Sequence, residues 1–137
     1  MGLILDSSVV IAAERRGDTV TALLKQIAAA TGDQRAVLSA VGVTELAHGI
    51  YRAQTPEVRN RREAFIRELL DDVEVYPYTK DTALLAAKID GEQQSKGLTI
   101  PFADLLIGAT ALEVGYSLLT ANARHFQMIP GLSVVQF

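Results

Sequence analysis

Short apolar runs alternate with longer stretches of helical periodicity along the whole chain. Apolar runs typical of buried strands occur at residues 3–5, 36–39, 73–76, 117–120 and 132–136. Helical spacing of apolar residues predicts helices at residues 9–15, 19–30, 43–53, 55–70, 80–94 and 102–114. Strands this short, apolar and separated by helices are typical of a parallel sheet covered on both faces. We therefore predict one α/β domain over residues 1–137, with about five parallel strands flanked by helices on both faces.

The segment 102–114 is unusual because it places a carboxylate in an otherwise apolar helix. Its polar residues are Asp104, Thr110 and Glu113, and helical spacing leaves no broad solvent face, so we expect the helix to be buried. A buried carboxylate must be protonated, hydrogen-bonded, paired or bound to a metal, because an unpaired buried charge is very costly. Asp104 therefore predicts a functional site that contains further acidic residues.

Three other polar residues lie where they could join Asp104. Asp6 closes the first strand, Glu45 lies in the first turns of the helix after the second strand, and Asn122 follows the fourth strand. In a parallel sheet these positions meet at the carboxyl ends of the strands. We expect no Lys, Arg or His between the carboxylates, so they would repel one another unless a cation lay among them. Oxygen ligands of this kind suit Mg²⁺ or Mn²⁺, which assist phosphodiester hydrolysis in many enzymes.

Composition narrows the classes of protein and of site. The chain has no cysteine, which excludes disulfides and thiolate metal sites. No apolar run reaches the roughly 18 residues of a membrane span, and we expect a cytoplasmic protein without a membrane partner. The net charge of −3 argues weakly against a polyanionic partner, but two bound divalent cations would change −3 to +1.

Each candidate residue also has an ordinary structural interpretation. Asp6 could be a turn or capping residue, and Ser7 or Ser8 could cap the following helix. Glu45, taken alone, is more typical of a solvated helix face, and Asn122 of a turn. The spacing of the carboxylates around an alternating fold favours the joint functional interpretation.

Histidines and arginines are weaker candidates. We expect His48 and His125 to be surface or capping residues rather than ligands. Arginines at positions 52, 59, 61, 62 and 67 could bind phosphates, but Glu63 and Arg67 have the spacing of a favourable helical pair. A solvated helix face is therefore the default interpretation for these arginines.

Four blocks of sequence, taken in order, resemble the PIN domain. They are LILDSSVVI at residues 3–11, VTEL at 43–46, IPFADLLIGA at 100–109 and LTANARHF at 119–126. The four blocks in order are a specific signal. The chain resembles the VapC toxins of bacterial VapBC toxin–antitoxin pairs, and the resemblance covers essentially the whole chain.

The resemblance implies a Mg²⁺-dependent endoribonuclease toxin of a type II toxin–antitoxin system. Asp6, Glu45 and Asp104 would bind Mg²⁺ or Mn²⁺ and carry catalysis, while Ser8, Thr120 and Asn122 would support the ligands or position substrate. The resemblance further implies cleavage of RNA to 5′-phosphate and 3′-hydroxyl ends, inhibition by a VapB-type antitoxin across the acidic edge, and a homodimer.

The chain departs from the family pattern in one place. Many members carry a fourth acidic residue after the fourth strand, where this sequence has Thr120, Asn122 and His125. We therefore expect the site to hold one divalent ion tightly and a second one weakly. Two other functions stay open: a non-catalytic PIN-like module that binds RNA or protein, and a phosphotransfer enzyme with Asp6 as nucleophile. The latter usually needs a second aspartate two residues on, where Ser8 stands.

Overall fold

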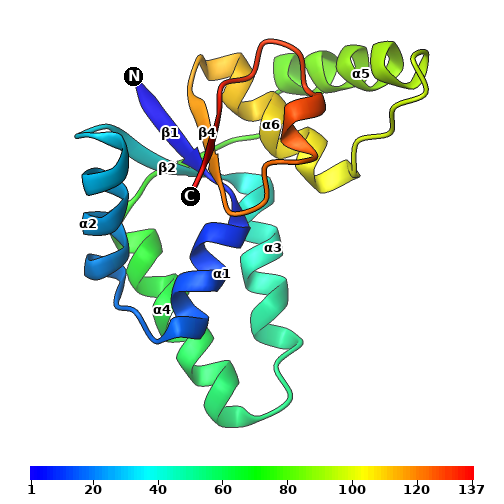
Figure 1. The fold of residues 1–137 in the computed structure, drawn as a ribbon. Coiled ribbons are helices and arrows are strands. Elements are labelled where there is room, and N and C mark those ends of the chain that lie inside the picture. The colour runs from blue at the N-terminus through cyan, green and yellow to red at the C-terminus, as the bar shows by residue number, and fades with distance from the viewer.

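A computed structural model describes residues 1–137 and contains six helices and five strands (Figure 1). The strands are β1 (Gly2–Leu5), β2 (Arg35–Ser39), β3 (Val75–Tyr76), β4 (Ser117–Thr120) and β5 (Val134–Gln136). The helices are α1 (Ser7–Arg16), α2 (Val20–Thr31), α3 (Ala40–Tyr51), α4 (Pro56–Asp72), α5 (Lys80–Gln94) and α6 (Phe102–Val114). A short 3₁₀ turn, η1 (Phe126–Met128), precedes β5.

The strands form one parallel sheet in the order β3-β2-β1-β4-β5. Ile4 in the central strand β1 pairs with Val37 of β2 on one side and Leu118 of β4 on the other. The chain leaves β1 toward β2 and later returns on the opposite side through β4, so the strand order reverses beside β1. A crevice beyond the carboxyl ends of the strands forms at such a reversal.

Helices cover both faces of the sheet, as the sequence predicts (Figure 1). Leu3 and Leu5 point into a core shared with α1, α2, α3 and α4. Ile4 points the opposite way, into a second core formed mainly with α5 and α6. This alternation follows from the two-residue period of a strand and explains why β1 is apolar at every position.

Several element boundaries differ from the predicted ones. Helix α3 begins at Ala40 rather than at residue 43, because Ser39 ends β2 and its hydroxyl accepts a hydrogen bond from the amide of Gly42 at 3.0 Å. Strands β3 and β5 are also shorter than the predicted 73–76 and 132–136. Element type is nevertheless correct throughout, and only the ends differ.

Helix α6 is buried along its middle but not at its first turn. Leu105 and residues 107–111 are buried, whereas Phe102 is 73% exposed and the Asp104 side chain is 23% exposed. The expectation that α6 has no solvent face is therefore wrong for the turn that carries Asp104. In the buried middle of α6, Gly108 allows the helix to pack closely against Ile129. A Cβ at position 108 would lie 2.2 Å from Cδ1 of Ile129.

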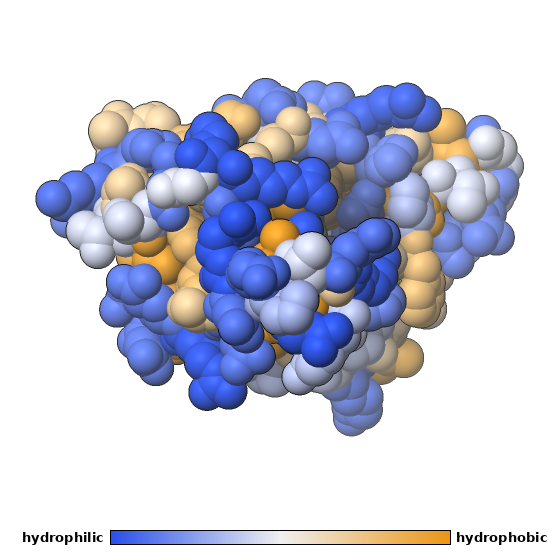
Figure 2. Space-filling view, turned by 90° about the horizontal axis from the view of Figure 1, so that it is seen from below, coloured by the Kyte–Doolittle hydropathy of each residue, from blue (hydrophilic) through white to orange (hydrophobic).

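The surface is mainly hydrophilic on the face drawn in Figure 2, with smaller hydrophobic areas between polar side chains. None of the six helices combines the length and the apolar character needed to cross a bilayer.

Candidate active site

Asp6 lies at the carboxyl end of the central strand and anchors the site to the sheet. Its amide donates a hydrogen bond to the carbonyl of Leu119 in β4 at 2.8 Å, and the residue is 5% exposed. The hydroxyls of Ser8 and Thr120 both donate to Oδ2 of Asp6, at 2.6 and 2.8 Å. Its other oxygen, Oδ1, has no hydrogen bond within the chain, so it is available to a ligand.

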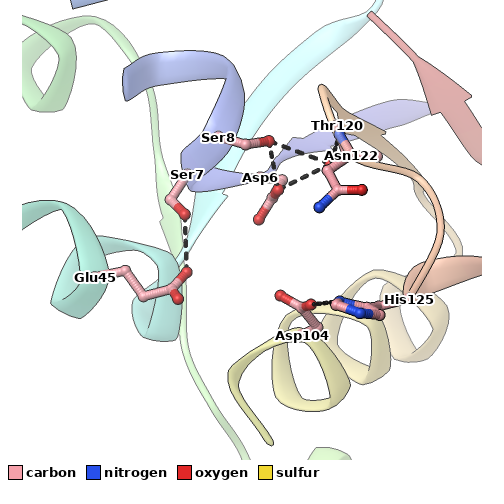
Figure 3. Close-up of polar contacts among 8 residues, drawn as sticks. All are labelled: Asp6, Ser7, Ser8, Glu45, Asp104, Thr120, Asn122 and His125. Carbon is pink, nitrogen blue, oxygen red and sulfur yellow. Dashed lines mark hydrogen bonds and ion pairs between the residues drawn. The ribbon is translucent and has the colours of Figure 1, made fainter. Parts of the chain in front are cut away.

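The loop after β4 is joined to this arrangement through the same two hydroxyls. Thr120 Oγ1 accepts a hydrogen bond from the amide of Asn122 at 3.0 Å, and Ser8 Oγ accepts one from the amide of Ala121 at 3.0 Å. Because Thr120 is fully buried, its hydroxyl fixes the loop and Asp6 relative to each other. The side chain of Asn122 extends from this loop toward the site (Figure 3).

Glu45 reaches the site from the second turn of α3. The hydroxyl of Ser7 donates to its Oε1 at 2.9 Å. Burial raises the pKa of Glu45, and the hydrogen bond from Ser7 opposes that shift. The charges of Asp6 and Asp104 raise the pKa further, while that of Arg52 lowers it. Glu45 therefore lies within electrostatic reach of both other carboxylates.

Asp104 reaches the site from the first turn of α6, on the other side of the sheet. Its Oδ2 is 2.9 Å from Nδ1 of His125, which follows β4. Burial is the main cause of the raised pKa of Asp104, and the charge of Asp6 adds to it. The hydrogen bond and charge of His125 lower this pKa, but not enough to cancel the effect of burial.

The three carboxylates face one common space, and each has a neighbour on its flank (Figure 3). No three acidic or imidazole groups lie close enough together to form a compact metal-binding cluster. The donor chemistry nevertheless fits a hard divalent cation, because all three groups offer oxygen and two have pKa values raised partly by mutual repulsion. A cation among them would relieve that repulsion and favour their charged forms.

The structure brings together all six residues that the sequence singled out: Asp6, Ser8, Glu45, Asp104, Thr120 and Asn122 (Figure 3). Sequence reasoning missed two others, Ser7 and His125. Ser7 and Ser8 do not cap α1, since Asp6 occupies the N-cap position without a side-chain cap and both hydroxyls bind carboxylates instead. The only sequence signal for Ser7 was its place next to Asp6.

His125, which we expected to be a surface or capping residue rather than a ligand, is partly exposed, and its ring contacts Asp104. His125 lies beside Asp104 on the flank of the site, and not between the carboxylates (Figure 3). The sequence offered one signal, which is that His125 falls in the block after β4 where the family commonly has acidic residues. His48 makes no side-chain hydrogen bond within the chain.

A pocket of about 330 Å³ adjoins Glu45 between α1, α3 and α4. Apolar side chains form its floor, and Arg15, Arg52 and Arg62 lie among its lining. Two arginines of α4 are not merely solvated: Arg61 pairs with the buried Glu14 of α1 at 2.9 Å, and Arg62 donates to the carbonyl of Gly49 in α3 at 2.8 Å. These contacts hold α4 against the helices that carry Ser7 and Glu45.

Comparison with known proteins gives the same family as the resemblance of the four sequence blocks. The PIN domain matches residues 3–132. Ribonuclease VapC1 of Rickettsia felis is 34% identical over 135 residues, which cover 98% of this chain and 96% of the relative. The tRNA(fMet)-specific endonuclease VapC of Salmonella typhimurium is 28% identical over 100 residues, covering 73% of this chain and 74% of the relative.

A solved structure supports the fold assignment. The chain superposes on a chain in the crystal structure of VapBC2 from Rickettsia felis bound to a DNA fragment from their promoter, with a TM-score of 0.86. The match covers 100% of this chain and 99% of the other, at 19% identity, so it bears on the fold alone. Together with the full-length relative, these matches establish that the chain belongs to the PIN-domain family and, within it, to the VapC ribonucleases, the toxins of VapBC type II toxin–antitoxin systems.

Proposed function

We propose that this ribonuclease depends on Mg²⁺, with Mn²⁺ as a substitute, and that Asp6, Glu45 and Asp104 hold the cation. The observation that carries this proposal is the convergence of three carboxylates on one space, with one oxygen of each held by a flanking side chain. Flanking hydrogen bonds fix the orientation of a carboxylate that binds a metal, and each of these carboxylates keeps one oxygen free for that role. Asn122 adds an amide near the same space but no charge.

The three carboxylates have different roles in the proposed hydrolysis of the phosphodiester. When bound, the cation supplies a Lewis acid for the attacked phosphate and lowers the pKa of water. Asp6 and Asp104 would fix the position of the cation relative to the sheet. Glu45, oriented by the hydroxyl of Ser7 and facing the same space, is placed to orient the attacking water and accept its proton. We infer that the 3′-oxygen is the leaving group, so that the products carry 5′-phosphate and 3′-hydroxyl ends, as the resemblance to the family implies.

Asp104→Asn tests the assignment of the site. The change keeps the size of the side chain and removes its charge, so we expect RNA cleavage to be lost while the protein stays folded. Cleavage of a mixed RNA pool and far-ultraviolet circular dichroism measure the two effects. Glu113→Gln is the matched control, since Glu113 lies at the exposed end of the same helix. Cleavage at the parent rate by Asp104→Asn in Mg²⁺ would overturn the assignment.

Removing the metal tests the cofactor. EDTA is expected to stop cleavage, and Mg²⁺ or Mn²⁺ to restore it. Ca²⁺ is expected to bind but to support little turnover, because its larger and looser coordination shell orients water poorly. Undiminished cleavage in EDTA would show that the carboxylates act without a metal.

We propose a VapB-type antitoxin as the protein partner. The crystal structures that this chain resembles include VapBC complexes from Rickettsia felis and Salmonella typhimurium. An antitoxin segment laid across the acidic edge would block access to Asp6 and Asp104, and the adjoining pocket offers it apolar contacts. Co-expression with the neighbouring upstream open reading frame, followed by co-purification and a cleavage assay, tests both binding and inhibition.

We also propose a homodimer that acts on cytoplasmic RNA. Large apolar side chains are exposed at Leu84 on α5 and Phe102 on α6, which supports burial of this layer in a self-association surface. Light scattering coupled to size-exclusion chromatography measures the mass. A monomer at micromolar concentration, or an unchanged dimer after Leu84→Ser and Phe102→Ser, would contradict the proposed surface.

A further inference from the structure

The hydrogen bond between His125 and Asp104 joins two elements that are separated in the sequence. Nδ1 of His125, in the loop after β4, is 2.9 Å from Oδ2 of Asp104 in the first turn of α6. Both side chains are partly accessible, at 28% and 23% exposure. Figure 3 shows the ring lying beside the carboxylate, on the flank of the site rather than at its centre.

The turn that follows His125 in the chain holds the imidazole in place. Phe126, the next residue, is 1% exposed and packs in the core formed with α6. The carbonyl of His125 accepts the amide of Met128 at 3.2 Å, and the carbonyl of Met128 in turn accepts the side chain of Gln93 from α5 at 2.6 Å. The ring is therefore presented to Asp104 by an anchored turn, not by a free loop.

The hydrogen bond engages one oxygen of Asp104 and leaves the other free, as is also the case in Asp6 and Glu45. Its Oδ2 is engaged by Nδ1, while Oδ1 has no hydrogen bond within the chain and remains free for a cation. Nδ1 carries a hydrogen in the matching neutral tautomer and in the charged ring, so the donor does not depend on the ring's charge. A donor that fixes the orientation of a ligating carboxylate typically strengthens metal binding.

We propose that His125 is a positioning residue for Asp104, which raises the affinity of the site for a divalent cation without itself binding the cation. This inference rests on the proposed role of Asp104 as a metal ligand. The segment after β4 then has a different role from the one it has in relatives with a further carboxylate there. In this chain the segment donates a hydrogen bond to an existing ligand, Asp104, and adds no negative charge.

The test measures Mn²⁺ binding to the full-length chain by calorimetry. His125→Ala removes the donor, and we expect about a 10- to 100-fold loss of affinity. His125→Asn places an amide N–H at the position of Nδ1, so it is expected to recover most of the affinity. His48→Ala removes the other histidine of the chain and is expected to leave the affinity unchanged. Thermal unfolding of each variant verifies that it is folded.

A spectroscopic measurement separates positioning from direct ligation. Pulsed electron paramagnetic resonance of bound Mn²⁺ detects a directly coordinated nitrogen. We expect no such nitrogen signal in the parent chain, and its presence would overturn the proposal by making His125 a ligand. Equal affinities of parent and His125→Ala would also overturn it, as would an Asn variant no better than the Ala variant.

Mn²⁺ binding to the parent chain and to Asp104→Asn distinguishes failure of the proposed metal site from failure of the proposed role of His125. If the parent binds no Mn²⁺, or if Asp104→Asn binds it as tightly as the parent, the proposed metal site itself is wrong. If Asp104→Asn loses the cation but His125→Ala keeps parental affinity, the metal site stands and the role of His125 is refuted.

Discussion

Thr120→Val isolates one hydroxyl that connects the sheet to the site. Thr120 ends β4 with its side chain fully buried, where it donates to Oδ2 of Asp6 at 2.8 Å and accepts the amide of Asn122 at 3.0 Å. Valine has nearly the same shape as threonine, so the change opens no cavity. The variant loses one hydrogen bond to a carboxylate and leaves one backbone N–H without its partner.

The expected loss of folding stability in Thr120→Val follows from these two contacts. A hydrogen bond to a charged group contributes about 1.5–3 kcal/mol, and an unpaired polar group adds to the loss. Ser8 still donates to Oδ2 of Asp6 at 2.6 Å and offsets part of it. The amide of Asn122 is partly accessible to water, which limits its penalty. We therefore expect the free energy of unfolding to fall by about 2 kcal/mol.

Thr110→Val is the matched control for this experiment. Thr110 is 1% exposed, and its hydroxyl donates to the carbonyl of Leu106 one turn earlier in α6 at 2.8 Å. That carbonyl keeps its regular helical partner when the hydroxyl is removed, so the cost should be well below that of Thr120→Val. Urea unfolding measures both variants, and an unchanged dependence on urea concentration shows that the unfolding transition is the same.

Mn²⁺ binding is the second measurement made on Thr120→Val and its control Thr110→Val. Thr120→Val is expected to weaken Mn²⁺ binding because Asp6 loses one of two donors on Oδ2, whereas Thr110→Val should leave it unchanged. Equal losses of stability in the two valine variants, together with parental Mn²⁺ affinity in Thr120→Val, would refute the argument that this hydroxyl supports Asp6.

The remaining predictions concern charge, packing and pH. Asn122→Asp adds a carboxylate to the site and should lower the Mg²⁺ concentration for half-maximal cleavage; identical metal titrations would place Asn122 outside the metal sphere. Gly108→Ala drives a methyl group against Ile129 and should destabilise the fold by about 1–3 kcal/mol in urea unfolding, unless Ile129 changes rotamer at no cost. Burial raises the pKa values of Asp104 and Glu45, so without metal each binds its proton more tightly in the folded chain than in the unfolded one. The stability that Asp104 contributes is thus complete below its ordinary pKa and declines as the pH rises through the raised value. The metal-free parent should therefore lose stability relative to Asp104→Asn as pH rises, and a constant difference would contradict the shift.

The order and type of the elements were predictable because each has a strong local signal. The central strand is apolar at every position, as a strand buried on both faces must be, and Thr19, Thr55 and Thr79 all cap the helices that follow them. The start of α3 was not predictable from periodicity. Ser39 serves both as the last residue of β2 and as the cap of α3, so no loop separates the two elements.

The carboxylates of the site were predictable, but their hydrogen-bond partners were not. Asp6, Glu45 and Asp104 could be placed at one edge because topology alone brings the ends of parallel strands together. The partner of each depends on side-chain direction within a turn. Ser7 and Ser8 differ by one position yet reach different carboxylates, and His125 reaches Asp104 because Phe126 anchors the turn beside it. Sequence spacing does not encode such directions.

The three carboxylates belong to three different parts of the fold, and this has a consequence for the toxin's durability. Glu45 comes from α3, Asp6 from the end of the central strand, and Asp104 from α6 across the sheet. A cation held by all three would act as a crosslink between the two helical layers. Its binding would slow amide hydrogen exchange on both sides of the sheet together, since opening either layer would break it. A cation-starved molecule would open more often and be a better substrate for cellular proteases, so the site would govern how long the toxin persists as well as how fast it cuts.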